Sequence, residues 1–477
     1  MQRPLKVGIL SLYYPKGSGS GTYNCSLMAE LARCGVEVHF LSPSTRQEAE
    51  LEFGTQFPLA RGDQGEPGRV LFHPSPNSFQ CPRLVAYARA DMPDGVEIEA
   101  AGDTVIASYI ETMSRWVRDV SNLMRLEVLI VNHVLPLPAV ASRSGIPYVV
   151  IPHGTMMTVA ARAPRRFHGL MMQGLEGARK VLCLNDDVTE RLRTQIRTHS
   201  PDGIVDRLSQ RFVPLPQGVD SHIFSADAVL PLDAPWLNRT VPKAIWFGQI
   251  LRSKGPDLAV AAWPLVFQRH PQADLTIVGR GAFSQDLTAF IEVLTTADPD
   301  RVVRFCEEKR LDELRAFYHG LQGSDREAYF AVARMIAKHV RYLGYFPQAS
   351  LAGILVKHDV ALVTSIAAEA APTVIHEAAI CGVVPIGIRH SGVRQELGAY
   401  ADISVRGYDL AELIMVSASM REVIPDLAGK VISVFDLLAV PSDRAHIRQG
   451  LMVRAREHSW PVIAQRLLAI FSDVIAT

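Results

Sequence analysis

The sequence predicts an α/β protein made of two doubly wound, Rossmann-like domains, and three observations lead to this fold class. Short apolar runs alternate with segments of helical periodicity along most of the 477 residues, as in the strand–helix–strand units of a parallel sheet. A chain of this length exceeds one ordinary core, so we expect two domains of about 200 residues each. Several apolar runs end in glycine-rich turns, which allow a ligand to approach the backbone at a sheet edge.

Composition narrows the classes of function. Lysine plus arginine and aspartate plus glutamate both number 49, so the formal charge is zero and nothing favours binding to nucleic acid. The six cysteines form no C-x-x-C pair. This argues against a structural zinc site or a disulfide scaffold and makes a reduced cytoplasm the simplest location. The first apolar run is short and no stretch approaches about 18 apolar residues, so we expect neither a signal peptide nor a membrane span.

One stretch, HDVALVTSIAAEAAPTVIHEAAICGVVPIGI at residues 358–388, organises the second half of the chain. Gly382 suits the left-handed position just past a helix end. The pattern predicts a strand, a loop, a short helix and a second strand, with the regular elements at Val360–Thr364, Val374–Cys381 and Val383–Ile388. The loop between strand and helix should therefore lie at the carboxyl edge of a parallel sheet, where open α/β sheets bind ligands.

The chemistry of this loop suits a nucleotide-sugar. The first backbone N–H groups of the helix, at Thr373 and Val374, lack intrahelical partners and lie at the positive end of the helix dipole, so they suit a phosphate. Glu369 and Glu377 can each accept hydrogen bonds from vicinal hydroxyls of a ribose or hexose ring. The alternative is structural, with Glu369 as a surface loop residue and Glu377 as a helix-capping residue that matches the dipole.

These residues resemble the E-x7-E segment of the retaining GT-B glycosyltransferases of family four. In that family the first glutamate touches the donor sugar and the second binds the nucleotide ribose. The resemblance covers the strand, the loop, both glutamates and the CGVVPIG turn, and it departs at AAPT, where the family usually has aromatic and glycine residues. It implies a GT-B fold, in which two Rossmann-like domains face each other across a cleft and the C-terminal helix crosses back to the first domain.

A glycine-rich segment, PKGSGSGT, follows the first predicted strand, Lys6–Leu12, and precedes a predicted helix, Tyr23–Arg33. A dinucleotide-binding loop would need an acidic residue at the end of the second strand, where Ser42 stands, so a nicotinamide site is disfavoured. A tight turn without a ligand is the structural alternative. The segment also resembles the family's glycine loop, which faces the donor phosphates and the acceptor. That resemblance implies a donor role for Gly19 and an acceptor role for Gly21.

Two histidines follow predicted strands of the first domain. His133 comes directly after Leu126–Asn132, and His153 comes after Tyr148–Pro152. A lone histidine at a strand end is usually a hydrogen-bonded loop residue, but two in succession on neighbouring strands favour a functional reading. The segment VNHVLPLPAVASRSGIPYVVIPHG resembles the family's two-histidine segment. There the residue matching His153 contacts the donor sugar, and we assign His133 to acceptor binding.

The basic segment AARAPRRFHG follows the second histidine. One interpretation is a solvated loop. The other is that Arg165 and Arg166 contact an anionic acceptor, such as a phosphorylated sugar or lipid.

The irregular, proline-rich residues 225–242 predict the domain boundary. PQGVD and the closing segment HSWPVIAQRLLAIFSDVI resemble the family's hinge and its last helix. We expect a first domain over 1–225, a second over 226–458, and a final helix over 459–477 that packs back on the first domain.

Inside the first domain, several segments are less regular. Residues 44–103 read as a long excursion with one strand, and residues 197–210 read as a polar insertion. Asp103 and Asp186 are predicted N-caps of the helices that follow them.

In the second domain, glycines end the predicted strands Ala244–Gly248, Leu275–Val278 and Val340–Gly344 or follow them directly. Residues 283–339 are mostly charged and helical, and we read about half of them as an insertion. We assign donor binding to residues at these strand ends, namely Gly248, Gln249, Gly279, Gly344 and Tyr345.

The loop GQILRSKG carries one departure from the family. There the residue after the glycine is usually an arginine, which clamps the pyrophosphate together with the following lysine. Here that residue is Gln249, which has no charge, while the lysine remains as Lys254. We hypothesise that Arg252 reaches back to replace the missing charge, and the alternative is a solvated surface arginine.

The resemblance runs over both domains and implies transfer of a sugar from a nucleotide-sugar, such as a UDP- or GDP-sugar, to a hydroxyl acceptor with retention. No residue cluster suggests a metal site and no other cofactor is expected. The acceptor would be a small molecule, a glycan or a lipid-linked sugar, with peripheral membrane contact left open. A catalytically degenerate sugar- or nucleotide-binding protein and a phosphorylase are the alternatives. The residues assigned to catalysis are His153, Glu369, Lys254 and Arg252.

Overall fold

The computed structural model describes residues 3–12, 19–43, 68–74, 83–85, 95–162, 164–200, 203–230, 235–238 and 240–476. The chain divides into two compact units. The first comprises Met1–Gly218 and Trp460–Thr477, and the second comprises Val219–Ser459. The chain thus enters the second unit a few residues before the predicted boundary.

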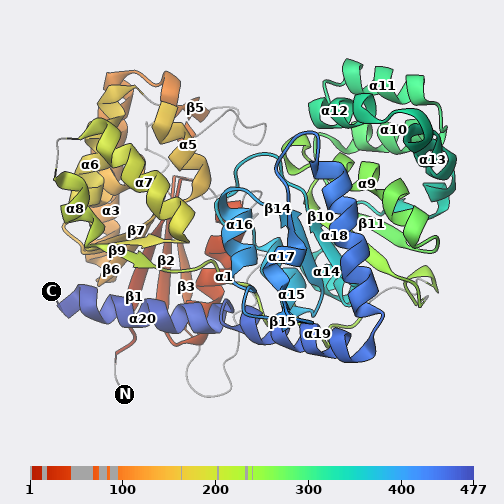
Figure 1. Cartoon of the computed structure of the whole chain (residues 1–477). Coiled ribbons are helices and arrows are strands. Elements are labelled where there is room, and N and C mark those ends of the chain that lie inside the picture. The colour runs from red at the N-terminus through yellow and green to blue at the C-terminus, as the bar shows by residue number, and fades with distance from the viewer. Residues whose placement is uncertain are drawn as a thin grey trace. The chain divides into compact units, whose positions relative to one another are not determined.

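In the first unit, parallel strands form one sheet in the order β3-β2-β1-β6-β7-β8-β9 (Figure 1). The strand order reverses between β1 and β6. From β1 the chain adds β2 and then β3 on one side, and from β6 it adds β7, β8 and β9 on the other. A short parallel pair, β4 (Arg83–Val85) and β5 (Gly95–Glu97), is separate from this sheet. The strands of the main sheet are β1 (Lys6–Leu10), β2 (Glu37–Ser42), β3 (Val70–Pro74), β6 (Val128–Asn132), β7 (Tyr148–Ile151), β8 (Lys180–Cys183) and β9 (Phe212–Pro214).

Two groups of helices cover this sheet. α1 (Gly19–Arg33) packs against the last helix, α20 (Trp460–Ala476). Right-handed crossovers place α1 on one face and the helices that lead from β6 toward β9 on the other. That second group packs in a row and consists of α3 (Asp103–Met124), α4 (Leu137–Ala141), α6 (Arg165–Gly177) and α7 (Asp186–His199). The remaining helical segments are η1 (Ile98–Ala100), α5 (Gly154–Arg162) and α8 (Ile204–Ser209).

The second unit repeats the same plan. Its parallel sheet has the order β12-β11-β10-β13-β14-β17, so the order reverses between β10 and β13. An antiparallel hairpin of β15 (Ser404–Val405) and β16 (Tyr408–Asp409) lies apart from the sheet. The sheet strands are β10 (Lys243–Gln249), β11 (Asp274–Arg280), β12 (Val340–Tyr342), β13 (Val360–Val363), β14 (Val384–Ile388) and β17 (Met415–Val416).

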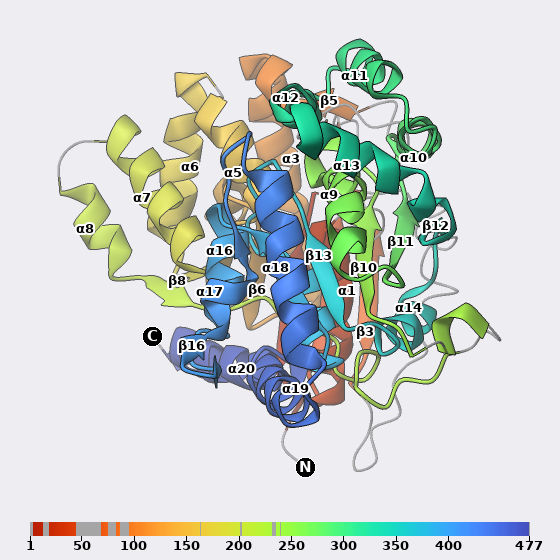
Figure 2. The same cartoon turned by 45° about the vertical axis from the view of Figure 1, so that its right-hand side comes forward.

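Helices pack in two groups in the second unit as well (Figure 2). One group contains α9 (Pro256–Arg269), α13 (Gly323–Ala333) and α18 (Val423–Leu438); the other contains α15 (Val374–Ile380), α16 (Ser391–Gly398) and α19 (Pro441–Arg456). The other helical segments are η2 (Pro235–Asn238), η3 (Arg252–Lys254), α10 (Ser284–Thr295), α11 (Pro299–Glu308), α12 (Asp312–Gly320), η4 (Met335–Lys338), α14 (Gln348–Leu355) and α17 (Leu410–Ile414).

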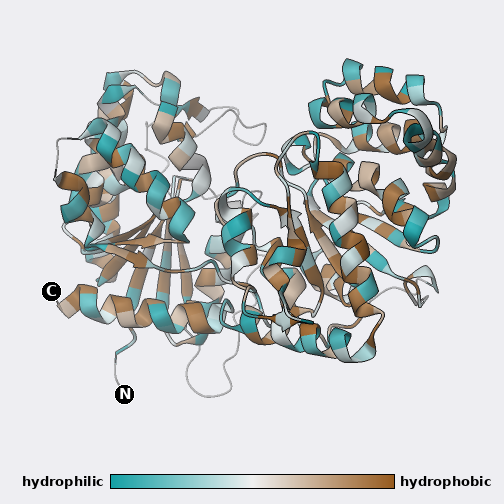
Figure 3. Ribbon diagram, in the orientation of Figure 1, coloured by the Kyte–Doolittle hydropathy of each residue, from teal (hydrophilic) through white to brown (hydrophobic). Residues whose placement is uncertain are grey.

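The predicted fold class is confirmed, because each unit is a parallel, doubly wound sheet between helices. The strands of both sheets are predominantly hydrophobic (Figure 3), as expected for parallel strands that are covered on both faces. The apolar stripe of α3 is also buried as its helical spacing requires, with Ile110, Met113 and Val117 at most 1% exposed. None of the helices among the described residues combines the length and the apolar character that a membrane span requires.

Both predicted N-caps are wrong by one residue. Asp103 is the first helical residue of α3, behind Gly102, which makes no side-chain cap. Asp186 likewise begins α7, and Asn185 caps the helix by accepting a hydrogen bond from the Val188 N–H at 3.0 Å. Asn185 can do so because its backbone is extended, with φ −165°.

Several segments differ from prediction in how much regular structure they contain. The segment 197–210 holds the end of α7 and all of α8, and the basic segment that includes Arg165 belongs to α5 and α6. Residues 408–456 are mostly helical, and the two-residue strands β16 and β17 interrupt the helices. Near the end of the segment 283–339, predicted as mostly helical, α13 ends at Ala333 and is followed by the 3₁₀ turn η4. Of the excursion 44–103, the structure describes the strands β3 to β5, and much of the remainder lies outside the described residues.

Helix α1 begins earlier than predicted. Gly19 and Gly21 lie in its first turn, and Gly21 is buried, so they do not form the predicted turn. The preceding residues of the glycine-rich segment, 15–18, lie outside the described residues.

Candidate functional site

Two oppositely charged side chains meet at the switch point of the second unit's sheet. Lys254 follows β10 and Glu369 follows β13, the two strands between which the order reverses. The Lys254 Nζ forms an ion pair with the Glu369 Oε1. Ligands of open α/β sheets bind at this position, beyond the carboxyl ends of the strands. The structure therefore brings together two residues that were predicted separately.

The Glu369 side chain and backbone are held from several directions. The Ser365 hydroxyl donates to its Oε1 at 2.7 Å. The Glu369 backbone N–H donates to the Ser391 Oγ at 3.0 Å, and its carbonyl accepts from the Gly392 N–H at 2.9 Å. The first two residues of α16 thus fix the loop that carries Glu369.

Ser391 holds this contact in an unusual backbone conformation. Its φ is +40°, in the left-handed region that non-glycine residues seldom adopt. Its Oγ is also 2.9 Å from the His390 Nδ1. Sequence reasoning missed Ser391, and the signal that could have found it is the SG pair that follows β14 at the same sheet edge.

The loop that carries Lys254 is tied to the end of β13. Gly255 has φ +62°, and a Cβ atom there would lie 2.2 Å from the Thr364 carbonyl oxygen, so the position requires glycine. The Thr364 hydroxyl donates to the Gly255 carbonyl at 2.6 Å and accepts from the Trp246 indole N–H at 2.9 Å. This network fixes Lys254 beside the Glu369 loop.

Glu377 lies on α15 and is partly buried. Burial raises the pKa of its carboxyl to about 7; the Asp220 carboxylate adds to this effect, and a hydrogen bond with Thr373 opposes it. Thr373 is the N-cap residue and Val374 the first helical residue of α15, as predicted for the helix start. The helix thus presents a carboxylate that is ready to accept hydrogen bonds once it is ionised.

The predicted glycines of this unit lie on neighbouring strand ends. Gly248 pairs in register with Gly279, and the Gly279 N–H donates to the Gly344 carbonyl at 2.7 Å. A Cβ atom at Gly279 would lie 1.9 Å from the Gly248 carbonyl oxygen, so the two strand ends can approach this closely because residue 279 is glycine. Gln249 is the exposed last residue of β10, and the exposed Tyr345 follows Gly344.

Arg252 points toward a carboxylate from another helix. It lies on η3, and its guanidinium is 3.8 Å from the Asp312 carboxylate, which also pairs with Arg315 at 3.1 Å. The predicted role of Arg252 as a clamp for diphosphate stays a prediction.

A chain of hydrogen bonds crosses the switch point of the first unit's sheet. The Asn24 amide donates to Ser11 at 3.4 Å, and the Asn132 amide donates to the Asn24 Oδ1 at 3.0 Å. The His153 Nε2 is 2.8 Å from the Asn132 Oδ1. Ser11 follows β1 and Asn132 ends β6, so this chain spans the point where the strand order reverses. Sequence reasoning identified His153 but missed the other three residues, because none of their residue types stands out at a strand end.

This chain sets the tautomer of His153. Because the Asn132 amide nitrogen donates to Asn24, its oxygen must accept from the His153 Nε2–H, which leaves the Nδ1 as an acceptor. Burial lowers the pKa of His153 to about 4, so the ring is neutral at physiological pH. His133 meets it edge to face, with ring centroids 5.1 Å apart, and its backbone has φ +70°. Burial and the neighbouring His153 lower the pKa of His133 as well.

The predicted acceptor residues of the first unit lie on separate helices. Gly21 is in the first turn of α1, and Arg165 is the exposed first residue of α6. The side chain of Arg166 lies outside the described residues. His168, in the same segment, is buried and stacks on His199.

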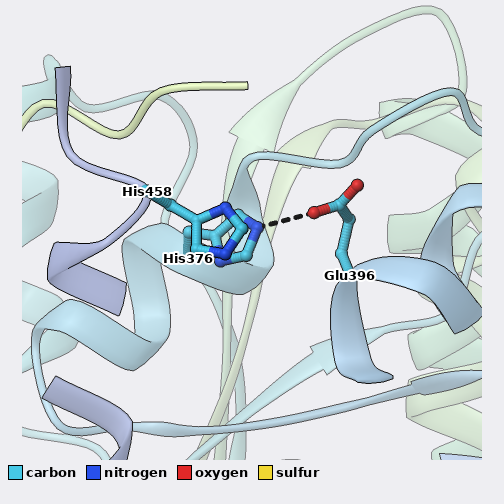
Figure 4. A group of neighbouring side chains, drawn as sticks. All are labelled: His376, Glu396 and His458. Atoms are coloured by element: carbon cyan, nitrogen blue, oxygen red, sulfur yellow. Dashed lines mark hydrogen bonds and ion pairs between the residues drawn. The ribbon is translucent and has the colours of Figure 1, made fainter. Parts of the chain in front are cut away.

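Figure 4 shows His376, Glu396 and His458 close together in the second unit. Their candidate ligand atoms lie within 4.8 Å of one another, so within the described part of the chain this is a group that could hold a metal ion. The two imidazole rings are stacked, with centroids 4.0 Å apart and 15° between their planes, so their lone pairs do not converge on one point. His376 also bonds to the Tyr400 hydroxyl at 2.7 Å and to Glu396 at 2.8 Å. The cluster therefore fits a hydrogen-bonded support for α15, the helix that carries Glu377, better than it fits a metal site.

Comparison with known proteins assigns both units to glycosyltransferase domains. Residues 18–201 match the model described as "Glycosyl transferase 4-like domain", and residues 235–412 match "Glycosyl transferases group 1". The chain is a GT-B glycosyltransferase of the family-four-like type. No curated protein matches this glycosyltransferase significantly.

Solved structures share the fold of this glycosyltransferase over nearly its whole length. A glycosyltransferase from Rickettsia africae is 12% identical, with a TM-score of 0.60 and 99% of each chain covered. Sucrose-phosphate synthase from Thermosynechococcus elongatus is 16% identical, with a TM-score of 0.58 and 99% of each chain covered. Anabaena HepE, solved in complex with UDP and glucose, is 13% identical, with a TM-score of 0.55 over 98% of this chain and 100% of that chain. At these identities the likeness concerns the fold.

Proposed function

We propose that this glycosyltransferase moves a hexosyl-type group from a nucleotide diphosphate sugar to a hydroxyl acceptor, with retention of the anomeric configuration and without a metal ion. The observation that carries the proposal is the Lys254–Glu369 ion pair at the switch point of the second unit's sheet. The loop that carries Glu369 leads into α15, the helix that carries Glu377. The complex of Anabaena HepE with UDP and glucose supports a nucleotide-sugar as the donor.

The charged groups of the second unit have complementary roles in this proposal. Lys254 neutralises the diphosphate as it departs, because its ammonium can exchange the Glu369 carboxylate for a phosphate oxygen. Glu369 then accepts hydrogen bonds from the donor sugar, and Glu377 accepts them from the ribose. The backbone N–H groups at the start of α15 add further positive potential. The departing phosphate takes the proton of the acceptor hydroxyl, so a separate catalytic base is unnecessary.

The first unit supplies the remaining groups of the proposal. The Nδ1 of neutral His153 can accept a hydrogen bond from a hydroxyl of the donor sugar. We assign acceptor recognition to His133, Gly21, Arg165 and Arg166. The cysteines that the structure describes are all free, which supports our proposal of a reducing, cytoplasmic location.

His153→Ala should lower the transfer rate about tenfold, because the sugar would lose one hydrogen bond in the transition state. The protein should remain folded, and its thermal midpoint should fall only modestly. His39→Ala is a matched control, since His39 is fully buried in the same sheet and bonded to Glu37 and His73. If the rate loss of His153→Ala only followed its loss of stability, as in the control, the histidine would have a structural role.

Glu377 should make nucleotide binding depend on pH. Its carboxyl has a raised pKa of about 7 and is therefore protonated below that pH, and only the ionised form accepts hydrogen bonds through both oxygens. The affinity for UDP or GDP should therefore fall about tenfold from pH 8 to pH 6. In Glu377→Gln this pH dependence of the affinity should disappear, because an amide does not titrate.

Isothermal titration calorimetry at both pH values measures this effect. The nucleotide phosphate also titrates near about pH 6, so the ratio of wild-type to variant affinity at each pH isolates the contribution of Glu377. An equal pH dependence in the two proteins would contradict the ribose role of Glu377.

A thermal-shift screen against nucleosides and nucleoside diphosphates tests the proposed function. A ligand that binds only the native state raises its stability, by about 2.7 kcal/mol at a concentration of 100 times Kd. We expect a clear rise in the midpoint for one nucleoside diphosphate and a smaller rise for its nucleoside. If no nucleoside diphosphate shifted the midpoint, the donor assignment would be wrong. Binding without transfer from any donor would favour the catalytically degenerate alternative.

A further inference from the structure

The second unit has too little positive charge for a diphosphate if only the predicted cations are counted. Lys254 lies at the switch point, but Glu369 already neutralises it. Gln249 ends β10 without a charge, and Arg252 pairs with Asp312. A leaving diphosphate carries more than one negative charge, which needs further neutralisation as the bond to the sugar breaks.

Arg280 lies directly beside the uncharged position. It is the exposed last residue of β11, and it pairs in register with Gln249 on the neighbouring strand. Parallel strands are about 4.8 Å apart, and side chains at paired positions leave the sheet on the same face. Gly248 and Gly279, which precede the two residues, have nearly the same φ, +146° and +148°. The two strand ends therefore bend alike and direct residues 249 and 280 to the same side.

The guanidinium of Arg280 is held by an aromatic ring. It lies over the ring of Tyr345 with its central carbon 4.4 Å from the ring centroid. Tyr345 is 57% exposed and follows β12, the next strand along the same sheet edge. Within the described residues, no carboxylate forms an ion pair with Arg280. A ring face contacts the flat side of a guanidinium and leaves its N–H edge available to a planar anion.

We infer that Arg280 supplies the second cation for the donor diphosphate, in place of the charge that Gln249 lacks, and that Tyr345 orients its guanidinium. This inference rests on the proposed function, because it assumes a nucleoside diphosphate at this sheet edge. It differs from the sequence-based hypothesis, which gave that role to Arg252. Arg252 has a carboxylate partner in α12, whereas Arg280 is stacked on a ring and, among the described residues, forms no ion pair with a carboxylate.

Calorimetry with UDP, GDP and the corresponding nucleosides tests this assignment. Arg280→Ala should weaken binding of the nucleoside diphosphate at least about tenfold and leave nucleoside binding unchanged, because only the phosphates would lose a charged partner. Arg252→Ala should weaken diphosphate binding less than Arg280→Ala, because Arg252 is 3.8 Å from the Asp312 carboxylate. Arg326→Ala is the matched control, since Arg326 is a partly exposed arginine that forms a surface ion pair with Asp300 at 3.0 Å.

A second variant guards against an indirect effect of Arg280→Ala. Gln249→Arg combined with Arg280→Ala should recover part of the diphosphate affinity, because the two positions are paired across neighbouring strands. Wild-type affinity in Arg280→Ala would overturn the inference, as would an equal loss for diphosphate and nucleoside, which would indicate a contact with the base. If wild-type protein bound no nucleoside diphosphate at all, the proposed function itself would fail. These outcomes are distinguishable in one set of titrations.

Discussion

Lys254→Ala should slow sugar transfer at least about 30-fold, which corresponds to about 2 kcal/mol of transition-state stabilisation. The reason is the growing negative charge on the departing diphosphate, which Lys254 is placed to neutralise at the switch point. The loss should appear in kcat, because this charge develops fully only as the bond to the sugar breaks. A continuous assay of nucleoside diphosphate release measures it.

Lys309→Ala provides the control for this variant. Lys309 forms an ion pair with Asp286 at 2.6 Å, as Lys254 does with Glu369, but it is the residue that follows α11. Its removal should leave the rate unchanged, because Lys309 belongs to neither of the loops that follow β10 and β13. A Lys254→Ala protein with wild-type kcat would show that the backbone amides and other cations suffice for the leaving group.

Glu369→Gln should lower kcat about 100-fold while preserving the affinity for nucleoside diphosphate. The amide keeps the size of the side chain but removes the charge that accepts hydrogen bonds from the sugar. The affinity for the diphosphate alone should stay equal or increase, because Lys254 would lose its internal counter-ion. Steady-state kinetics and calorimetry on the same preparation separate the two effects.

A double variant checks that the two residues act together. Lys254 and Glu369 form one ion pair. The decrease in kcat in the double variant Lys254→Ala/Glu369→Gln should therefore be smaller than the decreases of the two single variants combined. If the losses were fully additive, the two side chains would act independently. A loss of diphosphate affinity in Glu369→Gln would also contradict the assigned role.

Much of the fold could be predicted because its strands are buried on both faces. Such strands are continuous apolar runs, so β6 and β13 were recognisable from composition alone. The elements that escaped prediction are short. β15, β16 and β17 have two residues each, and two residues are too few to show the alternation of apolar and polar residues that predicts a strand. The caps differed by one residue, because Asn185 and Asp186 are both good capping types and only the backbone conformation selects between them.

The candidate site could be predicted only in part, for a different physical reason. Glu369 and Lys254 were found one at a time, from a pattern of residues along the chain. That they form an ion pair depends on the reversal of strand order between β10 and β13, which local sequence does not reveal. Ser391 and Asn132 are common polar residues whose importance comes from the partners that the fold gives them. The proposed role of Arg280 in diphosphate binding depends on the strand register, which places it beside Gln249.

The central claim is that the second unit binds a nucleotide-sugar and that Lys254 and Glu369 promote its cleavage without a metal. The most direct test incubates the wild-type protein and Lys254→Ala with a panel of UDP- and GDP-sugars in EDTA and follows release of nucleoside diphosphate. We predict release from one class of donor by the wild-type protein, undiminished by the chelator, and a strongly reduced rate in the variant. Absence of release from every donor, or release that requires a divalent ion, would contradict the account.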